Sequence, residues 1–199
     1  MMIKTIIFDL DGTLVNLPID YSIIRKNLQK FLHTNDELKP LIPSIINICK
    51  NDEELIKKSF SIICEEEERS FNNLSIIQNS FELLQKLKNK KISIILMTLQ
   101  CRSIVEKIFI EYNLDQIFSY NITRNEDTDR FSQIKKILNQ KKIIPAETLV
   151  IGDKLQDVIS AEKINCNSIL FNPLSKKIKN IQKKNIEIKK LSTIENLIK

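Results

Sequence analysis

The chain has 199 residues, of which 42% are hydrophobic and 28% charged, a composition typical of one globular domain with room for a modest insertion. Its longest apolar stretches, such as residues 92–99, are far shorter than the roughly 20 residues that a membrane-spanning helix requires. The N-terminus also lacks the charged start and apolar middle of a signal peptide. We therefore expect a cytoplasmic protein with no membrane partner.

The formal net charge is +6, which raises the question of nucleic-acid binding. The one concentrated basic tract, Lys176–Lys190, has isoleucines threaded through it, as expected for the solvated faces of packed elements. The acidic run Glu65–Glu68 is similarly expected on an exposed helix face. The sequence therefore predicts no nucleic-acid partner.

Cysteine and histidine content limits the possible chemistry. The four cysteines form no C-x-x-C pair and are predicted to be reduced thiols, with Cys101 packed in the interior; they are Cys49, Cys64, Cys101 and Cys166. The only histidine is His33, expected near the end of a helix, so catalysis of the usual Ser-His-Asp or Cys-His kind is excluded unless His33 serves. Acid–base or metal chemistry must therefore depend on carboxylates.

Along the chain, an apolar strand at Ile3–Phe8 is followed by a region of helical periodicity at residues 17–74. Within that region we expect three helices: Tyr21–Leu32, Ile42–Lys50 and Glu53–Arg69. Apolar runs then alternate with amphipathic ones, which is typical of βαβ units. Strands are predicted at residues 92–97, 148–151 and 168–171, with weaker ones at 117–121 and 186–188, and helices at 80–88, 102–112, 132–138 and 155–164.

These elements predict an α/β fold with a Rossmann-like three-layer core and a mostly parallel sheet. The core comprises residues 1–15 and 76–199, and residues 16–75 form a small helical cap inserted after the first strand. A cap of this kind excludes water and admits mainly small molecules.

Two acidic pairs follow apolar strands. Asp9 and Asp11 stand just past the first strand and precede Gly12, and Asp153 and Asp157 follow Gly152. Ligands of open α/β sheets bind outside the carboxyl ends of the strands. Gly12 and Gly152 are the only glycines in the chain, so their position beside both pairs is not explained well by ordinary turn chemistry. The pairs are therefore candidate site residues.

The sequence resembles the haloacid dehalogenase-like hydrolase superfamily, whose signature D-x-D-G-T-[LV] matches residues 9–14 letter for letter. Thr98 stands where the family has a Ser or Thr after the second core strand. Gly152, Asp153 and Asp157 match the fourth motif, and the helical insertion matches a C1-type cap, as in members of the phosphoglycolate phosphatase type. The resemblance covers essentially the whole chain.

The third motif departs from the family pattern. The family usually has a Lys, commonly followed by Pro, before the fourth motif, and no Lys-Pro occurs in this stretch. Arg130 is the preferred substitute, because it is a permanent cation just before a predicted helix. Lys135 and Arg124 are the alternatives, and a surface role for all three is left open.

The resemblance implies a role for each matching residue. Asp9 is the expected nucleophile, Asp11 the general acid and then base, and Thr98 and Arg130 stabilise charge on the phosphoryl group. The substrate-binding set is Gly12, Thr13, Thr98 and Leu99. The expected cofactor is Mg²⁺, held by Asp9, Asp153 and the backbone carbonyl of Asp11, with Asp157 as a direct or water-mediated ligand.

The predicted function is a Mg²⁺-dependent phosphatase that hydrolyses a small phosphorylated metabolite through an aspartyl-phosphate, working as a monomer or homodimer. Substrate specificity is expected from the cap, near Leu17, Tyr21 and Arg25. The alternatives are a phosphomutase of the same superfamily and a non-catalytic phosphate-binding or regulatory module. Asp11 favours phosphoryl transfer over dehalogenation, because a departing halide needs no proton.

Overall fold

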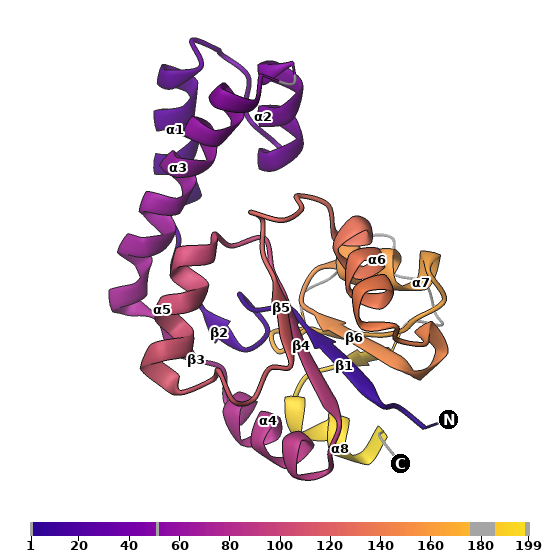
Figure 1. The fold of residues 1–199 in the computed structure, drawn as a ribbon. Coiled ribbons are helices and arrows are strands. Elements are labelled where there is room, and N and C mark those ends of the chain that lie inside the picture. Colours follow the sequence, from indigo (N-terminus) through magenta and orange to yellow (C-terminus); the bar gives the residue numbers. More distant parts are fainter. Residues whose placement is uncertain (1, 51, 176–185, 198–199) are drawn as a thin grey trace.

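The computed structural model describes residues 2–50, 52–175 and 186–197 (Figure 1). Six strands form one sheet in the order β5-β4-β1-β6-β7-β8, and every neighbouring pair is parallel. The strands are β1 Thr5–Phe8, β4 Ser93–Met97, β5 Tyr120–Ile122, β6 Thr148–Gly152, β7 Asn167–Phe171 and β8 Ile186–Ile188. This sheet confirms the predicted α/β fold.

Helices cover both faces of the sheet, because successive residues of the central strands point to opposite sides. Ile6 and Phe8 of β1 pack into one buried cluster with α4 Ser80–Asn89, α5 Arg102–Tyr112 and the short α8 Ile194–Leu197. Ile7 points the other way, into a second cluster with α6 Arg130–Lys141 and α7 Leu155–Lys163. The result is the three-layer core that the alternating pattern predicts.

Three helices form a separate lobe that rises from the edge of the core (Figure 1). They are α1 Tyr21–Phe31, α2 Leu41–Cys49 and α3 Glu53–Ser70, and they bury their own cluster around Ile24, Leu28, Ile45 and Ile63. We call α1–α3 the cap. The boundary of the cap at residues 16–75 stays a prediction.

The two chain segments that join the cap to the core run side by side. β2 Val15–Asn16 pairs antiparallel with β3 Ser75–Ile76, at the base of the cap. Neither strand was predicted, since two residues are too few to show a period. This ribbon sets where α1 begins and where the chain returns from α3.

Other elements differ from the sequence prediction at their ends. The weak strand expected at residues 117–121 is β5 at Tyr120–Ile122, because Ile117 and Phe118 lie in a turn after α5 and Phe118 stacks on Phe109. Helix α6 begins at Arg130 and not at Ser132, since Asp129 caps it by accepting a hydrogen bond from the Ser132 amide. Most of the basic tract Lys176–Lys190 lies outside the described residues.

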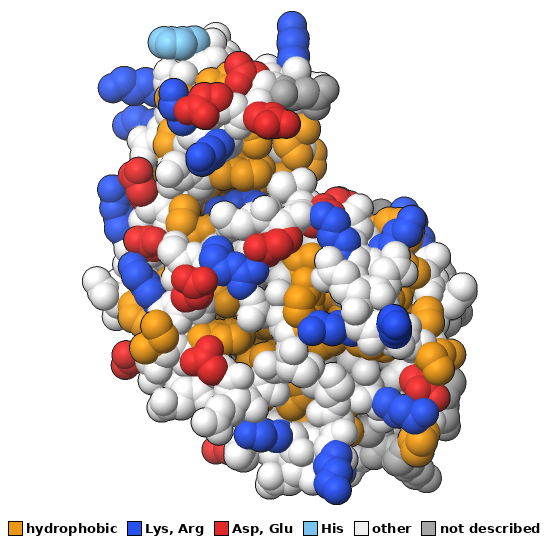
Figure 2. Space-filling model, in the orientation of Figure 1, with side chains coloured by type: hydrophobic (Ala, Val, Ile, Leu, Met, Phe, Trp, Pro, Cys, Tyr) orange, Lys and Arg blue, Asp and Glu red, His pale blue; other side chains and the backbone are white. Residues whose placement is uncertain are grey.

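On the face shown in Figure 2, Lys and Arg side chains alternate with Asp and Glu, with no large area of one sign. No helix in the described part of the chain is long and apolar enough to cross a bilayer.

Candidate active site

The carboxyl ends of three neighbouring strands bring the predicted site residues to one edge of the sheet. β1 lies between β4 and β6, so that Phe8 is level with both Leu96 and Ile151. Asp9 continues β1, and its amide donates to the Ile151 carbonyl at 2.9 Å. Thr98 follows β4 directly, and Asp153 follows β6. Strand order therefore juxtaposes residues that are far apart in the sequence.

Asp9, Asp153 and Asp157 form a compact carboxylate cluster. One oxygen from each lies within 4.8 Å of the others. Asp157 is fully buried in the first turn of α7, and Oδ1 of Asp153 is buried without a hydrogen-bond partner among the described residues. Carboxylate oxygens are the ligands that Mg²⁺ prefers, so this donor set fits a divalent cation. The Asp11 side chain is outside the cluster.

Both glycines are required by this close approach. Gly12 has φ of +84°, and a Cβ there would collide with the Asp153 carboxylate. A Cβ on Gly152 would collide with the Asp157 carboxylate. The glycines therefore make room for the acidic cluster, in addition to the turn that Gly12 makes with its positive φ.

Arg130 supplies the cation of the site. Its guanidinium is 2.5 Å from Oδ1 of Asp9 through Nη2 and 3.0 Å from Oδ1 of Asp157 through Nε, and Nη1 donates to the Met97 carbonyl at 3.0 Å. The contact with Asp157 is an ion pair without the alignment of a hydrogen bond. The residue is 7% exposed. Of the three candidate cations, Arg130 is the one that the structure brings to Asp9.

The two alternatives lie elsewhere. Lys135 is exposed on the outer side of α6. Arg124 is buried, and both of its terminal nitrogens pair with Glu67 of the cap, at 2.7 and 3.0 Å. Neither contacts the carboxylate cluster.

Burial dominates the electrostatics of both acids of the first motif. It raises the pKa of Asp9 to about 7, with further increases from Asp157 and Asp153, while Arg130 lowers it. Burial also raises the pKa of Asp11, although the Leu17 amide donates to its Oδ1 at 2.8 Å and favours the charged form. A raised pKa suits Asp11, because the predicted general acid must hold a proton near neutral pH.

A cavity of about 170 Å³ lies over the carboxylates, between core and cap. Tyr21 reaches it from the cap, whereas Leu17 is buried beneath and Arg25 bonds the carbonyls of Tyr21 and Leu38 instead. Burial raises the pKa of the Tyr21 hydroxyl to about 12, so this group is neutral. The cavity is lined by Asp9, Asp11, Tyr21, Thr98, Leu99, Gln100, Arg130, Lys154, Gln156 and Asp157.

Gly12 and Thr13 are not among the residues lining this cavity. The Gly12 amide donates to the Val15 carbonyl at 2.8 Å, and the Thr13 amide to the Leu10 carbonyl at 3.3 Å. Both residues were predicted to bind substrate, but in this conformation neither backbone amide is free to donate a hydrogen bond to it.

Sequence reasoning missed Gln133, which fixes the loops around the site. Its amide Nε2 lies within hydrogen-bond distance of the carbonyls of Thr98, Thr123 and Asp127, at 2.9, 3.1 and 2.9 Å. The residue is fully buried in α6, and its Oε1 is 3.4 Å from Nη1 of Arg130. A glutamine on the core-facing side of a helix was the available signal.

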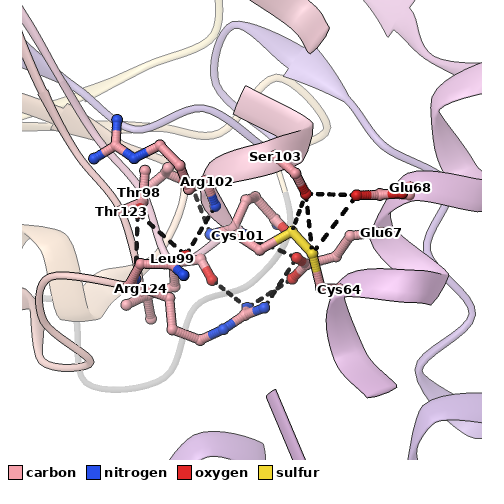
Figure 3. Close-up of polar contacts among 12 residues, drawn as sticks. Cys64, Glu67, Glu68, Thr98, Leu99, Cys101, Arg102, Ser103, Thr123 and Arg124 are labelled. Atoms are coloured by element: carbon pink, nitrogen blue, oxygen red, sulfur yellow. Dashed lines mark hydrogen bonds and ion pairs between the residues drawn. A yellow bond between two sulfur atoms is a disulfide. The ribbon is translucent and has the colours of Figure 1, made fainter. Parts of the chain in front are cut away.

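Two predictions about the cap side of the site were wrong. Cys64 of α3 and Cys101, just before α5, form a disulfide, so they are not reduced thiols, although Cys49 and Cys166 are free and buried. Glu67, expected on an exposed face, is 3% exposed and pairs with Arg124 (Figure 3). Contacts between residues so distant in the sequence leave no local pattern to recognise.

Residues 6–171 match the family of haloacid dehalogenase-like hydrolases. The chain belongs to this family. Since the match covers most of the chain, the resemblance seen in the motifs is confirmed. The residues predicted from the family motifs converge at the strand ends, which makes this place the candidate active site.

Individual relatives are distant. The chain is 25% identical over 189 residues to the pyrophosphatase PpaX of Bacillus mycoides, covering 85% of this chain and 83% of that protein. It is 18% identical to a solved structure described as a predicted phosphatase from Clostridium acetobutylicum, with a TM-score of 0.75 over 100% of this chain and 99% of the other. A structure described as a predicted phosphoglycolate phosphatase from Haemophilus somnus is also 18% identical, with a TM-score of 0.69 over 99% of this chain and 98% of the other. These likenesses confirm the fold.

Proposed function

We propose that the protein is a Mg²⁺-dependent phosphatase that hydrolyses a small phosphate monoester through a phosphoryl group carried by Asp9. The observation that carries the proposal is the convergence of Asp9, Asp153 and Asp157 on one point, with Arg130 in contact with two of them. Three carboxylates, offset by the Arg130 guanidinium and by the Lys154 ammonium that pairs with Asp153, leave net negative charge in this place. That imbalance fits a divalent cation and a phosphate group better than it fits a structural role.

Asp9 attacks phosphorus with a carboxylate oxygen, and the bond from phosphorus to the leaving oxygen breaks. Arg130, which already contacts Asp9, offsets the negative charge that gathers on the phosphoryl oxygens. Asp9, Asp153 and Asp157 would hold Mg²⁺, which supplies the positive charge that reduces repulsion between the dianion and the nucleophile.

Asp11 handles the proton. In its protonated form it gives a proton to the leaving oxygen, and it then takes a proton from the water that hydrolyses the acyl phosphate. Its raised pKa favours the protonated start of this cycle. The Leu17 amide donates to one oxygen of Asp11 at 2.8 Å, and this hydrogen bond keeps the carboxyl group at the cavity.

The cavity limits the leaving group. At about 170 Å³ it is small, and Lys154, held by Asp153 at 2.6 Å, places a second cation beside it. Small, anionic substrates fit this arrangement. The names of the relatives make pyrophosphate and phosphoglycolate the first two substrates to try. Hydrolysis is favoured over a mutase reaction, because no cap residue lining the cavity is suited to retain an intermediate.

The test is phosphate release from p-nitrophenyl phosphate, acetyl phosphate, pyrophosphate and phosphoglycolate, with Mg²⁺ and with a chelator. We expect turnover that requires the metal and falls by roughly a thousandfold or more in Asp9→Asn. The matched control is Asp115→Asn, which removes an exposed carboxylate and should leave turnover unchanged. Binding of phosphate without Asp9-dependent turnover on any substrate would instead establish a non-catalytic module.

A further inference from the structure

We propose that Cys64 and Cys101 are a reversible thiol–disulfide site, and that oxidation of the pair slows the enzyme by tying the cap to the core beside the active-site cavity. The effect on turnover rests on the proposed phosphatase function. The presence of the site and its effect on cap motion do not.

The disulfide joins the cap to the core, which otherwise meet only through non-covalent contacts and the two-stranded β2–β3 ribbon, here called the hinge ribbon. Cys64 lies towards the C-terminal end of α3, in the cap, and Cys101 is the N-cap residue of α5, in the core. Their Cα atoms are 5.6 Å apart. The chain itself passes between cap and core at β2 and at β3, so the disulfide is a third covalent connection.

Cys101 also belongs to the loop that forms one wall of the cavity. Thr98, Leu99 and Gln100 line the cavity and directly precede Cys101. Tyr21 lines the cavity from the cap side, and its hydroxyl hydrogen-bonds the Gln100 side chain. A bond between α3 and this loop therefore fixes the spacing of the two walls, and cap opening is the motion that admits substrate and releases product in lidded enzymes.

Polar contacts around the disulfide hold the same two elements together (Figure 3). The Cys101 amide donates to Glu67 at 2.9 Å, and Ser103 donates to Glu68 at 2.5 Å. Lys107 pairs with Glu68 at 3.1 Å. These contacts favour the closed position of the cap, in which Cys64 and Cys101 lie side by side, so that the reduced pair is able to close again each time the cap returns to it.

A reductant has access to the bond. Both cysteines line an open groove of about 640 Å³ between α3 and the loop at residues 124–128. Cys64 is half-buried and Cys101 is 4% exposed, so Cys64 is the sulfur that an incoming thiolate reaches first.

The exchange is balanced with a dithiol as the co-reactant. One thiolate of the dithiol attacks Sγ of Cys64, the bond between the two sulfurs breaks, and Cys101 leaves as a thiolate. The second thiol of the dithiol, after losing its proton, attacks the mixed disulfide and releases the Cys64 thiolate, so that two electrons pass to the protein. Cys101 is the leaving sulfur because Cys64 is the more exposed of the two and is attacked first.

A reversible bond also fits the predicted cytoplasmic location, because disulfides in reducing compartments are usually transient and redox-sensing. A metal is the other use for the pair, since Cys64, Glu67 and Cys101 lie close enough to share an ion. Both oxygens of Glu67 are already engaged, however, by Arg124 and by the Cys101 amide. The reduced pair is therefore left as two thiols.

The first experiment measures the bond and the cap motion without using activity. Protein oxidised with a low-molecular-weight disulfide should have two fewer titratable thiols than protein treated with dithiothreitol. Hydrogen exchange at residues 17–20, which follow β2, and at residues 71–79, which include β3, should be faster after reduction. Cys64→Ser and Cys101→Ser should match the reduced protein in both redox states, and Cys166→Ser should behave as the wild type. An unchanged thiol count, or exchange at the hinge that is indifferent to reduction, would overturn the proposal.

The second experiment measures turnover of whichever substrate the Asp9 test identifies. Reduced wild type should turn over at least about threefold faster than oxidised wild type. The change should appear in kcat, because cap opening limits product release. Cys64→Ser should turn over at the reduced rate and ignore the reductant. Equal rates for both redox states of the wild type would overturn the regulatory part. Absence of any Asp9-dependent turnover would count against the phosphatase function while the hinge measurement still decides the site.

Discussion

Two buried clusters of opposite charges lie close together in this protein, and they differ in charge balance. At the strand ends, three carboxylates meet two cations, because Arg130 contacts Asp9 and Asp157 while Lys154 pairs with Asp153. One oxygen of Asp153 still has no partner among the described residues. At the contact between α3 and the core, Glu67 and Arg124 pair one to one, at 2.7 and 3.0 Å. The first cluster is left needing positive charge, whereas the second is satisfied.

The difference separates a site from a structural connection. A buried charge without a partner of opposite charge lowers the stability of the fold, and such charges are found mainly where they bind a ligand. A closed pair, with Glu67 also accepting from the Cys101 amide and Arg124 also donating to the Leu99 carbonyl at 2.5 Å, has nothing left to offer a ligand. We therefore expect substitutions in the two clusters to affect different measurements.

The largest expected effect is on stability, in the balanced cluster. Arg124→Met should lower the free energy of unfolding by about 3–5 kcal/mol, because it leaves the Glu67 carboxylate buried and uncompensated. Urea denaturation monitored by circular dichroism measures this. The control is Lys107→Met, which removes an exposed partner of Glu68 and should cost less than about 1 kcal/mol. A loss in Arg124→Met no greater than in the control would contradict the structural role.

The next effect is on turnover, in the unbalanced cluster. Arg130→Gln should lower kcat by about 10²–10³-fold, because the phosphoryl group loses the cation that contacts Asp9. Arg130→Lys is the matched variant, since it keeps the charge and restores the residue type usual in the family at the third motif. It should recover part of the lost rate in steady-state assays with Mg²⁺. Equal rates for the Gln and Lys variants would argue that Arg130 acts through packing alone.

Most of the fold and the acidic part of the site were predictable. Buried strands read as apolar runs, so β1, β4, β6 and β7 were located to within two residues at each end. Asp9, Asp153 and Asp157 were identifiable because each follows a strand and a glycine lies beside each pair. These acidic residues could be found because the apolar strands and the glycines that mark the site lie next to them in the sequence.

What escaped prediction depends on contacts made only after folding. Glu67 looks like any other member of an acidic run on a helix, and only the packing of α3 on α5 buries it. The Cys64–Cys101 bond joins residues 37 positions apart, with no spacing rule to mark them. Gln133 was missed for the same reason, since its three carbonyl partners come from loops that meet only in the folded protein.

The smallest expected effect concerns Mg²⁺ and pH. In the metal-free protein the pKa of Asp9 is raised to about 7 from an ordinary value near 3.8. An acid whose pKa is raised on folding contributes most stability below its unfolded value, and this contribution is lost as pH rises towards the folded value. In the metal-free protein, Asp9 should therefore contribute less to the free energy of unfolding at about pH 8 than at about pH 5.5.

Mg²⁺ should reverse that loss, because it binds the deprotonated carboxylates that dominate at the higher pH. At a tenfold excess over Kd the stabilisation is about 1.4 kcal/mol, or roughly 3–6 °C in Tm for a chain of this length. Thermal unfolding with and without Mg²⁺ at both pH values measures it. The shift should be larger at the higher pH and absent in Asp157→Asn, whereas Glu67→Gln should keep it. A shift of equal size in Asp157→Asn would place the metal outside the strand-end cluster.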